Sequence, residues 1–101
     1  MKIEKQQNDN QIILLLDGEL DSTQAKSLEE AITNIPEGIT ELVLDLAKLN
    51  YTASAGLRTF LLANKIMKEK NGELKIINVN SNVYEILRIA SLIDVLKPEK
   101  I

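Results

Sequence analysis

Apolar residues along this chain alternate between strand-length runs and stripes at helical spacing. The continuous run Ile12–Leu16 is typical of a strand buried on both faces of a sheet, and Ile3–Gln6 forms a weaker strand before it. The turn-forming residues Asn8-Asp9-Asn10 separate the two strands. This arrangement predicts an antiparallel hairpin at the start of the fold.

The first helix is predicted by an apolar stripe that follows the hairpin. Residues at helical spacing begin at Ala25, and Pro36 then stops the helix. Three consecutive polar residues precede the stripe, and any of them could cap the helix: Asp21, Ser22 or Thr23.

Two further helices alternate with short strands in the second half of the chain. The strand Leu42–Leu44 precedes a helix that begins at about Ala55. A strand at Leu74–Ile77 leads to a third helix, for which Ser81 is the expected N-cap. The segment Asp94–Leu96 predicts a short strand or turn.

This alternation predicts a single α/β domain over residues 1–101, with a mixed, mainly parallel sheet of four to five strands and three to four helices. Crossover helices return the chain to the same end of a parallel sheet. The loops Gly18–Thr23, Leu46–Ala53 and Asn78–Asn82 should therefore gather at one rim, where partners bind in open α/β sheets.

The composition narrows the possible functions. A net charge of −3 and an aromatic content of 3% disfavour binding to nucleic acid or anionic membranes. The chain has no histidine and no cysteine, its carboxylates are scattered, and it has no glycine-rich phosphate loop. We therefore expect a binding module and not an enzyme, with no catalytic residue, no metal and no cofactor.

The chain also has no twenty-residue apolar segment and no apolar stretch of signal-peptide type at its N-terminus. These features predict a cytoplasmic protein that does not insert into a membrane.

Ser54 is the leading candidate for a functional residue, because it follows a predicted strand and opens a long helix. A serine there caps the helix, and the unpaired N–H groups of the first turn would stabilise a phosphate on its hydroxyl. A plain cap worth about 1 kcal/mol explains the serine equally well. It does not explain Ala55 and Gly56, which cost helix propensity but would let another surface approach Ser54.

The segment Ala53-Ser54-Ala55-Gly56-Leu57-Arg58, six residues after Asp45-Leu46, resembles the phosphorylation site of STAS-domain anti-sigma factor antagonists. The resemblance implies that an anti-sigma factor serine kinase phosphorylates Ser54 and that a phosphatase reverses this step. It also implies that the unphosphorylated chain binds that kinase and releases a sigma factor, with Asp21 on the kinase-facing surface.

The rim and the resemblance together predict the residues that bind the partner: Asp21, Ser22, Thr23, Tyr51, Thr52, Ala55, Gly56, Arg58 and Asn80. Two features depart from the family pattern. Ala53 stands where many members have aspartate or serine, and the chain stops soon after Leu96, so a final helix is expected to be short or missing.

The alternative function is a constitutive STAS adaptor subunit of a stress-signalling or ATP-binding-cassette transporter complex, which would use the same rim without phosphorylation.

Overall fold

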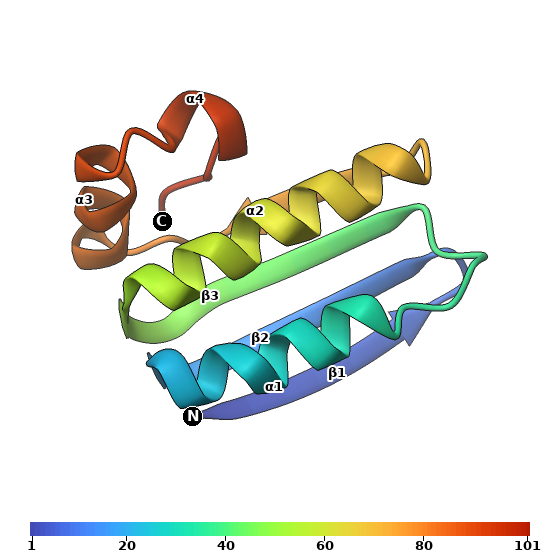
Figure 1. The fold of residues 1–101 in the computed structure, drawn as a ribbon, viewed down its shortest axis with the longest axis horizontal. Coiled ribbons are helices and arrows are strands. Elements are labelled where there is room, and N and C mark those ends of the chain that lie inside the picture. The colour runs from blue at the N-terminus through green and yellow to red at the C-terminus, as the bar shows by residue number, and fades with distance from the viewer.

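Four strands form one mixed sheet in the order β1-β2-β3-β4 in the computed structural model, which describes residues 1–101 (Figure 1). Strand β1 (Lys2–Asn8) pairs antiparallel with β2 (Gln11–Leu20), so the predicted hairpin is confirmed. Strands β3 (Glu41–Thr52) and β4 (Glu73–Ile77) extend the sheet with parallel pairing. The mixed, mainly parallel sheet and the α/β class are as predicted.

Helices α1 and α2 lie side by side across one face of this sheet, and both begin at the same end of it (Figure 1). The other two helices lie on the side of α2 away from α1 (Figure 1). Their bounds are α1 (Ser22–Thr33), α2 (Ser54–Glu69), α3 (Ser81–Ile89) and α4 (Ile93–Leu96). The expectation of a short strand or turn at Asp94–Leu96 is therefore wrong, because this segment forms the single turn of α4.

The hydrophobic core lies between the sheet and the helices. Alternate residues of β2, namely Ile12, Leu14 and Leu16, are buried in the same cluster as Phe60 and Met67 of α2. The residues between them in β2 are only half-buried. The prediction that this strand is buried on both faces is wrong, because both long helices pack on one face of the sheet.

Strand β3 does not end at Asp45 but continues to Thr52, so most of the predicted loop Leu46–Ala53 is strand. Its register with β2 shifts twice, and each shift adds one residue to β3. At the first shift the Asp45 carboxylate accepts hydrogen bonds from the Ala47 N–H at 3.0 Å and from Asn78 Nδ2 at 3.1 Å. Bulges of this kind bend a strand and increase its twist, and β3 continues beyond both shifts to Thr52, two residues before α2 begins.

Candidate functional site

The first turns of α1 and α2 are joined at the end of the sheet. Leu20 of β2 pairs with Thr52 of β3, and the Ala53 N–H donates a hydrogen bond of 2.9 Å to the Leu20 carbonyl. One strand then continues into α1 through Asp21, and the other continues into α2 through Ala53. This pairing brings Asp21 and Ser54 to the same rim, as the sequence predicts.

The two helix starts differ in how they are capped. Asp21 caps α1, because its Oδ1 accepts a hydrogen bond of 2.8 Å from the Gln24 N–H. Helix α2 begins at Ser54, the residue expected to cap it, and the N-cap position falls on Ala53, which has extended backbone angles and no side-chain hydrogen bond. The prediction that Ser54 caps α2 is wrong, since Ser54 is the first residue inside the helix.

The Ser54 side chain is exposed, and its hydroxyl takes part in none of the intramolecular side-chain hydrogen bonds. The Ala53 carbonyl accepts from the N–H groups of Gly56 and Leu57. The N–H groups of Ser54 and Ala55 have no acceptor in the chain. The start of α2 therefore presents a free hydroxyl beside two free backbone donors.

Two of the predicted contact residues are buried beneath this helix start. The Thr52 side chain is 1% exposed, and its hydroxyl donates to the Ala53 carbonyl at 3.0 Å. A Cβ on Gly56 would lie 2.2 Å from Thr52 Oγ1 and 2.6 Å from Leu20 Cδ2. The expectation that Thr52 and Gly56 contact a partner is wrong, because both serve the packing of α2 on the strand ends.

Asn80 is also engaged inside the fold. Its Oδ1 accepts a hydrogen bond of 3.0 Å from the Val83 N–H, and its Nδ2 donates to the Leu49 carbonyl at 2.7 Å. Asn80 therefore caps α3 and joins it to β3, which corrects the expectation of a Ser81 cap. Its half-buried side chain uses both polar groups inside the fold, so we expect it to contribute little to partner contact. The usable signal was an asparagine just before the helical stripe, which is at least as good a cap as serine.

The remaining predicted residues are accessible at the rim, and together with Ser54 we call them the rim surface. Five of them are exposed together with Ser54, and Ala55 is half-buried. Tyr51 is 49% exposed and presents an aromatic ring at the rim. The rim surface comprises Asp21, Ser22, Thr23, Tyr51, Ser54, Ala55 and Arg58.

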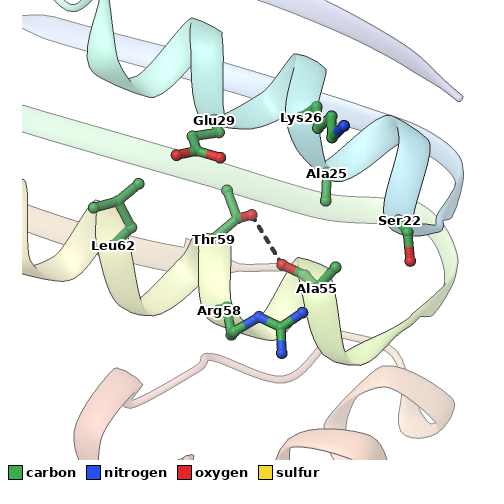
Figure 2. A pocket seen from close by; sticks show the side chains of 8 residues that line it. All are labelled: Ser22, Ala25, Lys26, Glu29, Ala55, Arg58, Thr59 and Leu62. Carbon is green, nitrogen blue, oxygen red and sulfur yellow. Dashed lines mark hydrogen bonds between the residues drawn. The ribbon is translucent and has the colours of Figure 1, made fainter.

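A groove of about 440 Å³ runs from the rim surface between α1 and α2 (Figure 2). The sequence reasoning missed two charged residues of α1 that line it, Lys26 and Glu29, although each follows another lining residue by four positions. On the α2 side, the Thr59 hydroxyl donates to the Ala55 carbonyl at 2.9 Å (Figure 2). The groove is lined by Ser22, Ala25, Lys26, Glu29, Ala55, Arg58, Thr59 and Leu62.

Neither ion pair of the chain includes a residue of the rim surface or of the groove. Lys75 pairs with Glu41 at 3.5 Å, and Arg88 pairs with Glu85 on α3. Hydrogen bonds from Arg88 hold the pKa of Glu85 below its usual value. No three histidine, cysteine, aspartate or glutamate side chains come together in the fold, and no helix has the length and hydrophobicity needed to span a membrane.

A family model described as the STAS domain matches residues 2–100. The chain belongs to the STAS domain family. BtrV of Bordetella bronchiseptica, which is provisionally named an anti-sigma factor antagonist, is 33% identical to this chain over 96 residues. The matched residues cover 94% of this chain and 83% of BtrV. The anti-sigma-B factor antagonist of Bacillus subtilis is 28% identical over 96 residues, or 95% of this STAS chain and 88% of the relative.

Several solved structures share the fold of this chain. The anti-sigma factor antagonist SpoIIAA has a TM-score of 0.70 in its unphosphorylated form, at 15% identity over 87% of this chain and 83% of SpoIIAA. Its phosphorylated form has a TM-score of 0.75, at 15% identity over 90% and 85%. A sulfate transporter family protein from Wolinella succinogenes reaches 0.77, at 16% identity over 86% and 74%. The likeness to these structures shows a common fold.

Proposed function

We propose that this STAS chain is an anti-sigma factor antagonist that binds an anti-sigma factor kinase, and so releases a sigma factor, when Ser54 is unmodified. The observation that carries the proposal is the exposed, unengaged Ser54 hydroxyl at the start of α2, beside the start of α1. The names of the relatives from Bordetella bronchiseptica and Bacillus subtilis support the same function.

For phosphorylation, this chain has to supply only the Ser54 hydroxyl and the backbone N–H groups beside it, because the kinase performs the chemistry. The kinase transfers the γ-phosphoryl group of ATP to Ser54 Oγ, so that a new P–O bond forms while the bond to ADP breaks. The hydroxyl proton passes to a base of the kinase. The free N–H groups of Ser54 and Ala55 and the helix dipole then stabilise the phosphate. A phosphatase hydrolyses the ester and restores the binding form.

The rim surface supplies the contact area for the kinase. Tyr51 offers an exposed aromatic ring, and aromatic residues often carry a large share of interface energy. Asp21 and Arg58 add exposed charges of opposite sign to the same rim surface. These groups fix the orientation of a partner that packs closely over the Ser54 hydroxyl.

Phosphorylation weakens this complex through charge and size. A phosphate adds about −1.5 to −2 charges at neutral pH, at the centre of the rim surface. The chain already carries a net charge of −3. An anti-sigma partner that fits the free hydroxyl closely has to lose its contacts to accommodate the charged group.

The test is phosphorylation by an anti-sigma factor kinase that binds this chain, with mass spectrometry to map the modified residue. We expect one phosphate, on Ser54, and none on the Ser54→Ala variant. Ser22 is the matched control, because it is also exposed and is also the first residue of its helix. A phosphate on Ser22 in the parent chain, or an unchanged yield in Ser54→Ala, would contradict the assignment.

The alternative is a constitutive adaptor that uses the rim surface without modification. Its support is the shared fold of the sulfate transporter family protein from Wolinella succinogenes, at a TM-score of 0.77. An adaptor would bind its partner equally well with serine, alanine or phosphoserine at position 54. Absence of phosphate after incubation with a kinase that binds the chain would favour this alternative.

A further inference from the structure

We propose that Arg58 binds the phosphate of phosphorylated Ser54 within the same chain. The inference deepens the proposed function and rests on it for the presence of a phosphate on Ser54. It assigns to Arg58 an intramolecular role that is separate from contact with the kinase.

Ser54 and Arg58 lie on one side of α2, separated by one helical turn. Ser54 is the first residue of the helix and Arg58 the fifth, and both side chains are exposed. Residues at this spacing have Cβ atoms about 5–6 Å apart on the helix surface. A phosphate ester on Ser54 therefore lies within the reach of an arginine side chain.

The Arg58 side chain already extends toward the start of the helix. Long side chains in helices point back toward the N-terminus, because the other rotamer collides with the preceding turn. Figure 2 shows the Arg58 guanidinium directed along α2 toward Ala55 in the first turn. Binding the phosphate then requires little rearrangement of Arg58.

Arg58 is also free of competing partners. It takes part in neither of the two ion pairs and in no side-chain hydrogen bond. Lys26 and Glu29 of α1 line the groove together with Arg58, and Glu29 forms no ion pair with it. Asp21, just before α1, is engaged as the α1 cap. Ala53 has no side chain that could occupy the free N–H groups first.

The chemistry favours arginine for this role. The planar guanidinium can donate two parallel hydrogen bonds to phosphate oxygens, and such charge-assisted pairs are stronger than neutral ones. Pairing with the phosphate would also remove the Arg58 charge from the rim surface. Phosphorylation would then add the negative phosphate to Ser54 and, at the same time, pair the positive guanidinium of Arg58 with it.

The test is a phosphorus-31 NMR titration of the full chain with phosphoserine incorporated at position 54 during translation, so that no kinase is needed. A nearby guanidinium favours the dianion and lowers the second pKa of the phosphate. We expect this phosphate pKa to rise by roughly 0.3 to 0.7 in Arg58→Ala, and by less in Arg58→Lys, which keeps a charge.

Lys65→Ala is the matched control, because it removes one exposed positive charge from the same helix. Lys65 lies about 16 Å from Ser54 along the helix axis, beyond the screening length of about 8 Å at physiological salt. A phosphate pKa that moves no further in Arg58→Ala than in Lys65→Ala would overturn the inference. Failure of the kinase to modify Ser54 would instead count against the proposed function and leave this titration unaffected.

Discussion

The Thr52 hydroxyl lies directly beneath Gly56, where an added Cβ would come within 2.2 Å of Thr52 Oγ1. Leu20 closes the same space from the neighbouring strand, with its Cδ2 atom 2.6 Å from that position. The strand ends and the first turn of α2 therefore meet through a residue that has no side chain. Because Gly56 has no Cβ, the first turn of α2 can pack closely on the strand ends, and this packing fixes the position of Ser54 on the rim.

Gly56→Ala should destabilise the fold by about 1–3 kcal/mol through overpacking, although alanine is the better helix former. Chemical denaturation of the two proteins measures the difference. Gly38→Ala is the control, because a Cβ there meets nothing within 4 Å. An unchanged or higher stability of Gly56→Ala would show that the helix start moves easily, contrary to this account.

Ser54→Ala should change the free energy of unfolding by less than about 0.5 kcal/mol, because the exposed Ser54 side chain does not cap α2. Ser54→Asp should stabilise the fold by about 0.3–1 kcal/mol, since it places a carboxylate at the positive end of the helix. Thermal unfolding of both variants checks these values. A loss of 1 kcal/mol or more in Ser54→Ala would indicate a cap after all.

Ala53→Asp should stabilise the chain by about 1 kcal/mol, because a carboxylate at the N-cap position can accept from the N–H groups of the first turn. In a domain of this size, such a gain raises the melting temperature by roughly 4–8 °C. Ala53→Asn separates capping from charge and should retain most of the gain. If neither variant melts higher than the parent, the free N–H groups are not a source of instability.

Asn80→Ala should cost about 2 kcal/mol, since it removes both the α3 cap and the hydrogen bond to the Leu49 carbonyl. Asn80→Asp keeps the cap but loses the donor to Leu49, so its cost should be smaller. Denaturation curves measure both costs. Binding to the kinase should persist in each folded variant, and selective loss of binding would restore Asn80 to the partner surface.

The sequence predicted the elements that depend on regular patterns. The hairpin, the parallel strands and a polar cap of α1 among Asp21, Ser22 and Thr23 follow from hydrophobic spacing and turn chemistry, and the structure shows that Asp21 is the cap. Helical spacing describes the buried face of α2 only in part, because Phe60 and Met67 are buried whereas Leu61 is 36% exposed. The small residue Ala63 of α2 faces the hydrophobic core instead and is fully buried there.

The misses come from features that no periodic pattern records. The two extra residues in β3 interrupt the alternation of its side chains, so the pattern predicts only Leu42–Leu44 as a strand. The caps of α2 and α3 each lie one residue before the predicted serine, because backbone angles and not residue preference decide where a helix begins. The sequence places Thr52 in a polar loop and predicts that Gly56 lets a partner approach Ser54, but both residues are buried where α2 packs on the strand ends.

The most direct test of the proposed switch is calorimetric titration of the anti-sigma factor kinase with four forms of this chain: parent, Ser54→Ala, Ser54→Asp and phosphoserine 54. The account predicts equal affinity for parent and alanine, and at least a tenfold loss, about 1.4 kcal/mol, for the aspartate and phosphoserine forms. Circular dichroism establishes beforehand that all four are folded. Equal affinity of the kinase for the parent and phosphoserine forms would contradict the account and favour a constitutive adaptor.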